Sequence, residues 1–279
     1  MTRVYDRKTR KVTEVPQYGG GGLNFLYNNP FGRVILRFVS GHLCSNIYGA
    51  YNHSRLSRHS IKSFIAKNHM EIENPEQYKS FSEFFTRKEQ RTVDEGRNVL
   101  ISPADSKLLC YDINPDQIIK IKHTKYSVRD LIDQDCEGFE GGHCLVFRLA
   151  VDNYHRYCFA DDGEMLEKKH IKGRLHTVSS FSDKYKVYIQ NDREMSILQT
   201  KHFGKMIQIE VGAMLVGRIK NVDKTTFKKG EEKGYFDFGG STVVLLVNKD
   251  IKIDDDILAQ SAKGIETKVS YGERIGEKC

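Results

Sequence analysis

The chain has 279 residues, enough to bury a substantial core as one large domain or two small ones. Its 44 Lys and Arg against 37 Asp and Glu give a formal charge of +7, which modestly favours polyanionic partners. No apolar run reaches the ~18 residues of a membrane-spanning helix, and no common nucleic-acid motif occurs, so we expect no nucleic-acid partner.

The six cysteines include no CxxC pair and no Cys/His pairs at zinc spacing, so we expect no structural metal. The opening residues, MTRVYDRKTRK, are polar and carry no apolar signal core. We therefore expect a cytoplasmic origin and reduced thiols. The cysteines are Cys44, Cys110, Cys136, Cys144, Cys158 and Cys279.

The N-terminal third predicts a leader followed by amphipathic helices. Residues 1–26 contain a glycine run at 19–22 and are expected to form a flexible leader. Residues 27–97 are expected to be helical and membrane-proximal, because apolar positions recur there at helical spacing. The first such helix either faces the core or lies in a membrane interface with its arginines on lipid head groups. Its apolar positions are Phe31, Val34, Ile35, Phe38 and Val39, and its basic ones are Arg33 and Arg37.

Residues 98–279 read mostly as short strands separated by turns. No internal repeat and no linker divides this region. A chain with helices first and strands after predicts an α+β fold, in which N-terminal amphipathic helices precede a mainly β catalytic core.

The most unusual stretch is FDFGGSTVVLLV, residues 236–247. Glycine lacks a Cβ atom, so Gly239 and Gly240 mark a bend or a close backbone approach immediately before Ser241. An apolar, β-rich run follows. Taken alone, the pattern has an ordinary explanation, a tight entry into a buried strand.

Two further polar residues lie at the ends of predicted strands. Asp105 follows a proline in a turn, where aspartate side chains commonly bond to nearby backbone. His155 lies just past an apolar strand, and a single histidine is more often a structural hydrogen-bonding residue than a catalyst. Neither residue predicts a site without further support.

Five segments supply that support: FSEFFTRKEQRTVD (81–94), SPADSK (102–107), FRLAVDNYHRYC (147–158), VGAMLVGRI (211–219) and KKGEEKGYFDFGGST (228–242). In this order they resemble one enzyme family, the pyruvoyl-dependent phosphatidylserine decarboxylase proenzymes of the prokaryotic type. The resemblance extends from about residue 27 to the C-terminus.

The resemblance implies that the chain makes its own cofactor. The hydroxyl of Ser241 would attack the carbonyl of Gly240, and β-elimination would then cut the chain and leave a pyruvoyl group at the new N-terminus. The products would be fragments 1–240 and 241–279. The pyruvoyl carbonyl would form a Schiff base with the substrate amine and accept electrons as CO2 leaves.

Asp105, His155 and Ser241 match the Asp-His-Ser catalytic set that the resemblance implies, with one departure. The family usually has two histidines three residues apart, and the second is generally assigned as the base. Here the first is His155 and the second is replaced by Cys158. We predict that the imidazole of His155 serves this site, with Cys158 as a thiolate and His176 as further candidates.

The resemblance also implies that the substrate is phosphatidylserine in an anionic membrane, converted to phosphatidylethanolamine and CO2. We expect a peripheral protein on the cytoplasmic side of the cell membrane, because each Lys or Arg near such a surface contributes about 1 kcal/mol. A homodimer of processed units is a further implication. The basic candidates for the surface are Lys120, Lys122, Lys125, Lys168, Lys169, Lys172 and Arg174.

Two other interpretations stay open. A relative that decarboxylates a soluble amino acid would keep Gly240 and Ser241 but would not need an apolar face over residues 31–39. A non-catalytic lipid-binding relative would never mature, because its catalytic set is incomplete at Cys158.

Overall fold

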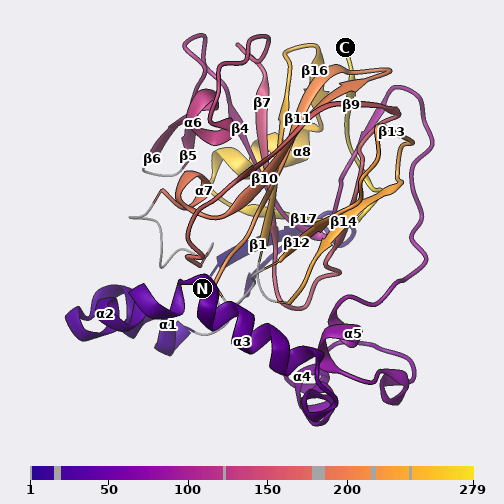
Figure 1. Cartoon of the computed structure of the whole chain (residues 1–279). Coiled ribbons are helices and arrows are strands. Elements are labelled where there is room, and N and C mark those ends of the chain that lie inside the picture. Colours follow the sequence, from indigo (N-terminus) through magenta and orange to yellow (C-terminus); the bar gives the residue numbers. More distant parts are fainter. Residues whose placement is uncertain (1, 16–19, 122–123, 178–185, 215–217, 239–240) are drawn as a thin grey trace.

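In the computed structural model, helices from the N-terminal part of the chain lie along one end of a β-rich body (Figure 1). This arrangement confirms the predicted α+β fold. The structure describes residues 2–15, 20–121, 124–177, 186–214, 218–238 and 241–279.

Sequence signals define where the helices of this layer begin. At the start of α2, the Asn29 side chain accepts a hydrogen bond from the Phe31 backbone N–H at 2.9 Å, and Pro30 occupies the first turn. At the start of α5, Ser80 accepts one from the Glu83 N–H at 3.2 Å. The layer comprises α1 (Gly20–Asn28), α2 (Pro30–Val39), α3 (His42–His53), η1 (Arg55–His59), α4 (Ser60–Lys67), η2 (Pro75–Gln77) and α5 (Phe81–Phe85).

The main sheet has ten strands in the order β13-β9-β10-β11-β15-β7-β4-β17-β1-β2. Neighbouring strands are antiparallel except for β1 and β17, which are parallel. The strands are β1 (Thr2–Asp6), β2 (Lys11–Val15), β4 (Ser106–Asp112), β7 (His143–Leu149), β9 (Gly163–Ile171), β10 (Arg193–Thr200), β11 (Gly204–Val211), β13 (Thr226–Phe227), β15 (Ser241–Val247) and β17 (Glu266–Val269).

Smaller sheets and short helices cover the main sheet. One small sheet contains β8 (Arg156–Cys158), β12 (Ile219–Asn221) and β14 (Glu232–Phe236). A second contains β3 (Val99–Ile101), β16 (Ile251–Ile253) and β18 (Arg274–Lys278), and a third pairs β5 (Ile118–Ile121) with β6 (Thr124–Ser127). The remaining helices are α6 (Val128–Ile132), α7 (Val187–Gln190) and α8 (Asp255–Ala262).

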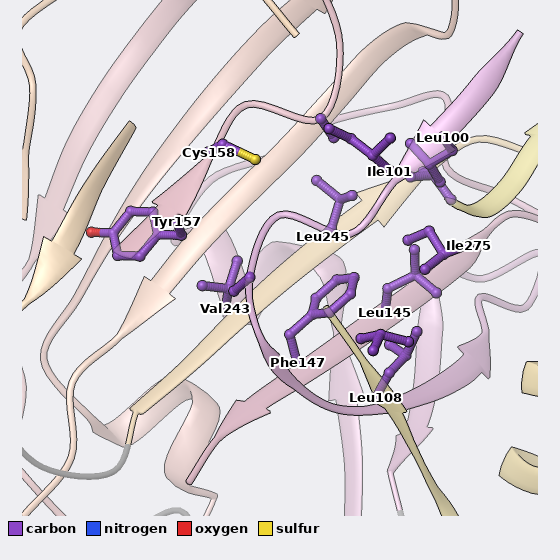
Figure 2. Packing of buried hydrophobic residues seen from close by; sticks show 14 of the residues in the cluster. Leu100, Ile101, Leu108, Leu145, Phe147, Tyr157, Cys158, Val243, Leu245 and Ile275 are labelled. Atoms are coloured by element: carbon purple, nitrogen blue, oxygen red, sulfur yellow. The ribbon is translucent and has the colours of Figure 1, made fainter. Parts of the chain in front are cut away.

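Strand β15 lies at the centre of the main sheet and is buried at every position. Val243 and Leu245 belong to a hydrophobic cluster on one side of the sheet, together with Tyr157 and Cys158 (Figure 2). Val244 belongs to a second cluster on the other side. A strand covered on both faces has no polar positions to alternate, which explains its continuous apolar sequence.

The expectation of a flexible leader over residues 1–26 is wrong for its first part. Strand β1 pairs with β17 and β2 inside the main sheet, and α1 already begins at Gly20. Only Val4 of β1 is buried, so the segment lacks the alternating apolar pattern that predicts a strand. Its place depends on backbone pairing with a distant strand and on Arg7, which forms ion pairs of 2.8 Å with Asp254 and Asp256.

Candidate active site

Ser241 is the first residue of the central strand. It pairs with Leu149 of β7, while the adjacent Thr242 pairs with Val211 of β11. The side chain is fully buried, and its hydroxyl has no hydrogen-bond partner among the described residues. An unpaired buried hydroxyl costs free energy, and the hydroxyl of the adjacent Thr242 is likewise buried without a partner among the described residues. Gly240, the predicted cleavage partner, lies outside the described residues.

His155 lies just before β8 and is 1% exposed. Its Nδ1 is 2.8 Å from the carbonyl oxygen of Asn153. Because a carbonyl only accepts hydrogen bonds, Nδ1 carries the proton, and the neutral ring has its lone pair on Nε2. The ring lies against Phe85 of α5, with the ring centroids 4.2 Å apart. The neutral tautomer is therefore one in which Nε2 can accept a proton.

The backbone also connects His155 to the segment that leads to Ser241. The carbonyl oxygen of His155 accepts a hydrogen bond from the Phe236 N–H at 3.0 Å. Phe236 ends β14, five positions before Ser241 in the sequence. His155 and the approach to the predicted cleavage point thus lie at the same end of the small sheet.

Asp105 is held by two partners, and neither is His155. One carboxylate oxygen accepts a hydrogen bond from the Tyr271 N–H at 2.7 Å, and the other forms a 3.0 Å ion pair with Arg91. The Arg91 guanidinium in turn stacks over the ring of Tyr154, at 4.4 Å from its centroid. The Arg91 guanidinium therefore links Asp105 to Tyr154, the residue that precedes His155. Because the Ser241 hydroxyl also has no described partner, the three predicted residues do not form a hydrogen-bonded chain here.

Cys158 is a poor proton acceptor in this fold. Its side chain is fully buried, and burial raises the pKa of the Cys158 thiol to about 12. The thiol lies in the hydrophobic cluster between the main sheet and β8 (Figure 2). At neutral pH it is protonated, so the thiolate on which its candidacy depends is not formed.

His176 is tied to the strand next to Ser241 through an asparagine. Its ring nitrogen Nδ1 is 3.3 Å from the Tyr27 hydroxyl, and burial lowers the pKa of the His176 imidazole. Asn191 donates hydrogen bonds to the carbonyl oxygens of His176, at 2.8 Å, and of Gly212, at 2.7 Å. Gly212 directly follows β11, whose last residue pairs with Thr242. These bonds give His176 a structural function.

A buried ion pair lies on the same face of the sheet as Ser241. Glu210 of β11 pairs in register with Val243, two residues after Ser241, so the side chains of all three point to one side. The Glu210 carboxylate is 2.7 Å from the Lys233 ammonium, and both side chains have no exposed surface. Sequence reasoning missed this pair, since its members are 23 positions apart on strands of different sheets.

The helical layer presents a wide apolar surface to solvent. Phe31 is 80% exposed and Phe38 is 72% exposed, whereas Leu36 is the buried apolar residue of α2. The helix α2 therefore does not turn its predicted apolar positions toward the core, and that alternative is wrong. The exposed apolar residues of α2, α3 and η1 are Phe31, Val34, Ile35, Phe38, Leu43, Ile47, Tyr51 and Leu56. In the described part of the chain, no helix combines the length and hydropathy needed to cross a membrane.

Two of the basic side chains proposed for a membrane surface are engaged in ion pairs on β9. Lys168 and Lys169 are on β9 and form ion pairs with Glu194, at 3.3 Å, and Asp133, at 3.0 Å. Lys122 lies outside the described residues. The exposed apolar side chains of α2 and α3 therefore mark a more specific contact surface than these lysines do.

Comparison with known sequences identifies relatives of this chain. A family model described as phosphatidylserine decarboxylase matches residues 78–277. The chain is 48% identical over 284 residues to phosphatidylserine decarboxylase proenzyme 2 of Clostridium acetobutylicum, an alignment that covers 98% of each chain. The chain belongs to the phosphatidylserine decarboxylase family. It is also 40% identical over 295 residues to the phosphatidylserine decarboxylase proenzyme of Clostridium perfringens, and the alignment covers 100% of each chain.

Family membership confirms the resemblance on which the site was predicted. The proenzyme from Clostridium tetani is 39% identical over 295 residues, covering 100% of this chain and 99% of the relative. The region that the family model matches, residues 78–277, includes Asp105, His155 and Ser241. The roles of these three residues are predictions that rest on the resemblance.

Proposed function

We propose that this chain is a pyruvoyl-dependent phosphatidylserine decarboxylase that is made as a proenzyme. It cuts itself between Gly240 and Ser241 and then converts phosphatidylserine to phosphatidylethanolamine and CO2. The observation that carries the proposal is the Ser241 hydroxyl, which is buried at the start of the central strand with no partner among the described residues. In a member of this family, such a hydroxyl is best explained as a nucleophile.

Self-cleavage uses only atoms of the chain and water. The oxygen of Ser241 attacks the carbonyl carbon of Gly240, the amide C–N bond breaks, and an ester and a free amine form. Loss of the α-proton of Ser241 then breaks its Cβ–Oγ bond and leaves a carboxylate on Gly240. The resulting dehydroalanine reacts with water and releases ammonia, which leaves the pyruvoyl group. No oxidant or reductant is needed.

His155 is the residue we assign to proton transfer in these steps. Its Nδ1 contact with Asn153 directs the lone pair of the neutral ring to Nε2. Its contact with Phe85 and its backbone bond to Phe236 hold the ring beside the segment that leads to Ser241. Asp105 acts as a positioning residue through Arg91, since its carboxylate has no direct contact with the imidazole.

The residues around Ser241 fit a cofactor made from the serine itself. The hydroxyl makes no described hydrogen bond, so its consumption leaves no neighbouring group without a partner. When formed, the pyruvoyl group supplies a carbonyl that binds the substrate amine and withdraws electrons as CO2 leaves. The buried side chains of Leu149 and Val243 exclude water from this end of the strand and lower the local polarity.

The exposed apolar surface of α2 and α3 supports phosphatidylserine as the substrate. A lipid substrate requires the enzyme to reach a bilayer, and amphipathic helices bind the interface through buried apolar area. Phe31 and Phe38 on α2 and Leu43 and Ile47 on α3 are all more than half exposed. Peripheral binding to the cytoplasmic side of the cell membrane and a homodimer of processed units remain predictions.

A decarboxylation assay separates this proposal from its alternatives. We expect the purified chain to release labelled CO2 from carboxyl-labelled phosphatidylserine in vesicles and none from free labelled serine. Release from serine alone would favour a decarboxylase of soluble amino acids. Release from neither substrate, with the chain intact, would favour a non-catalytic lipid-binding protein.

A further inference from the structure

The last described residues before the Gly-Gly-Ser sequence are fixed by the helical layer. The side chain of Asp237 is 8% exposed and bonds to two helices. Ser82 of α5 donates a hydrogen bond to one carboxylate oxygen at 2.6 Å, and His53 Nε2 of α3 is 2.8 Å from the other. The Asp237 N–H also donates to the carbonyl oxygen of Arg218 at 3.0 Å. Backbone and side chain are thus both held immediately after β14.

Phe238 is held by an aromatic cluster in an unusual backbone conformation. Its φ of +62° lies in the left-handed region, which a residue with a bulky side chain rarely adopts without support. That support comes from the rings of Tyr48 on α3 and of Phe81 and Phe85 on α5. Their centroids lie 5.3, 5.0 and 5.0 Å from that of Phe238. The helices therefore impose a conformation that the isolated segment would not choose.

Helix α5 also contacts His155, the residue that we assign to proton transfer. Phe85 of α5 packs against both Phe238 and the imidazole of His155, with the latter centroids 4.2 Å apart. One short helix thus fixes the spacing between the segment before the cleavage point and His155. Attack by Ser241 requires the carbonyl of Gly240 and the proton acceptor in a defined geometry, and small displacements of reacting groups are costly in rate.

We propose that α3 and α5 position the segment before Gly240 for self-cleavage, with Asp237 and Phe238 as positioning residues. This inference rests on the proposed self-cleavage and adds a function for the helical layer within it. After the cut, both residues belong to the C-terminal end of fragment 1–240, whereas the new pyruvoyl group begins the other fragment. The positioning therefore acts before the cut, and the decarboxylation step does not depend on it.

The test compares maturation rate with turnover in the full-length chain. Precursor loss after synthesis is followed for wild type, Asp237→Asn and Ser82→Ala, with Asp223→Asn as a control. Asp223 is an exposed aspartate in the loop between β12 and β13, and no described residue bonds to its side chain. We expect the first two variants to mature roughly 10- to 100-fold more slowly and the control to mature like wild type.

Two further readouts separate positioning from a general loss of structure. Decarboxylation of phosphatidylserine per mole of processed fragment should match wild type in Asp237→Asn and Ser82→Ala. Ser82→Thr keeps a hydroxyl and should mature at close to the wild-type rate, and this serine–threonine pair carries the test if Asp237→Asn does not fold. Wild-type maturation in the first two variants, or an equal loss of maturation and of turnover per processed fragment, would overturn the inference. If wild type itself is never cut, the proposed function fails instead.

Discussion

Lys233 and Glu210 form a 2.7 Å ion pair in which neither side chain has any exposed surface. Burial raises the pKa of Glu210, while the Lys233 charge and a hydrogen bond from Asn221 act in the opposite direction. The pair joins β11 of the main sheet to β14, the strand that leads to Ser241. It therefore connects the centre of the core to the start of the predicted cleavage segment.

Removing one member of this pair should destabilise the protein severely. We expect Glu210→Leu in the uncut Ser241→Ala background to lower the free energy of unfolding by about 3–5 kcal/mol, because the Lys233 ammonium stays buried without its partner. The double variant Glu210→Leu/Lys233→Met should recover most of that loss, since it buries no charge. Urea denaturation measures both. Equal stability of the single and double variants would contradict a direct interaction.

Stability should also fall at alkaline pH. Burial raises the pKa values of the Cys110, Cys144 and Cys158 thiols, that of Cys158 to about 12. The folded state then keeps protons that the unfolded chain loses above about pH 8.5, so unfolding becomes more favourable as the pH rises. Above about pH 8.5, each buried thiol lowers the free energy of unfolding by about 1.4 kcal/mol per pH unit, until the pH reaches the pKa of that thiol in the folded state. Urea denaturation from pH 7 to 10 should show this slope, and it should be shallower in Cys158→Ala.

Self-cleavage should depend on His155 and not on Cys158. We expect Cys158→Ala to be cut at close to the wild-type rate, because the buried thiol is protonated at neutral pH. His155→Ala should be cut at least about 100-fold more slowly, within the usual range for loss of a general base. The fraction of cut chain over time measures both. Normal cutting of His155→Ala would transfer the role to another group.

Membrane binding should depend on the apolar surface of α2. Phe38→Asp places a charge in the middle of this surface and should abolish co-sedimentation with vesicles that contain phosphatidylserine. Leu166→Asp is a matched control, because Leu166 is an exposed apolar residue on strand β9 and belongs to neither α2 nor α3. The control should sediment with vesicles like wild type. Equal binding by both variants would show that the helices are not the contact surface.

The sequence predicted those elements whose pattern is local. The apolar run after Ser241 is a strand buried on both faces, and the spacing of Phe31, Ile35 and Phe38 is that of a helix with these residues on one exposed side. Strand β1 was not predicted, because Val4 is the one buried residue of this strand and because β1 pairs with β17, which is distant in the sequence.

The candidate site was predictable in its membership but not in its contacts. Asp105, His155 and Ser241 follow from short motifs, whereas the partners of Asp105 are Arg91 and Tyr271, which no spacing in the sequence brings together. The contacts of Asp237 and the left-handed Phe238 likewise depend on how helices from one end of the chain meet a strand near the other. Such long-range contacts have no local signal in a single sequence.

Intact-protein mass spectrometry of the freshly purified chain tests the central claim most directly. Two fragments that separate between Gly240 and Ser241 are predicted. The smaller one should be lighter than its serine-initiated sequence by one ammonia, as a pyruvoyl terminus requires. The Ser241→Ala variant should give a single intact mass and release no CO2 from phosphatidylserine. A single intact mass for wild type, or decarboxylation by the uncut variant, would contradict the account.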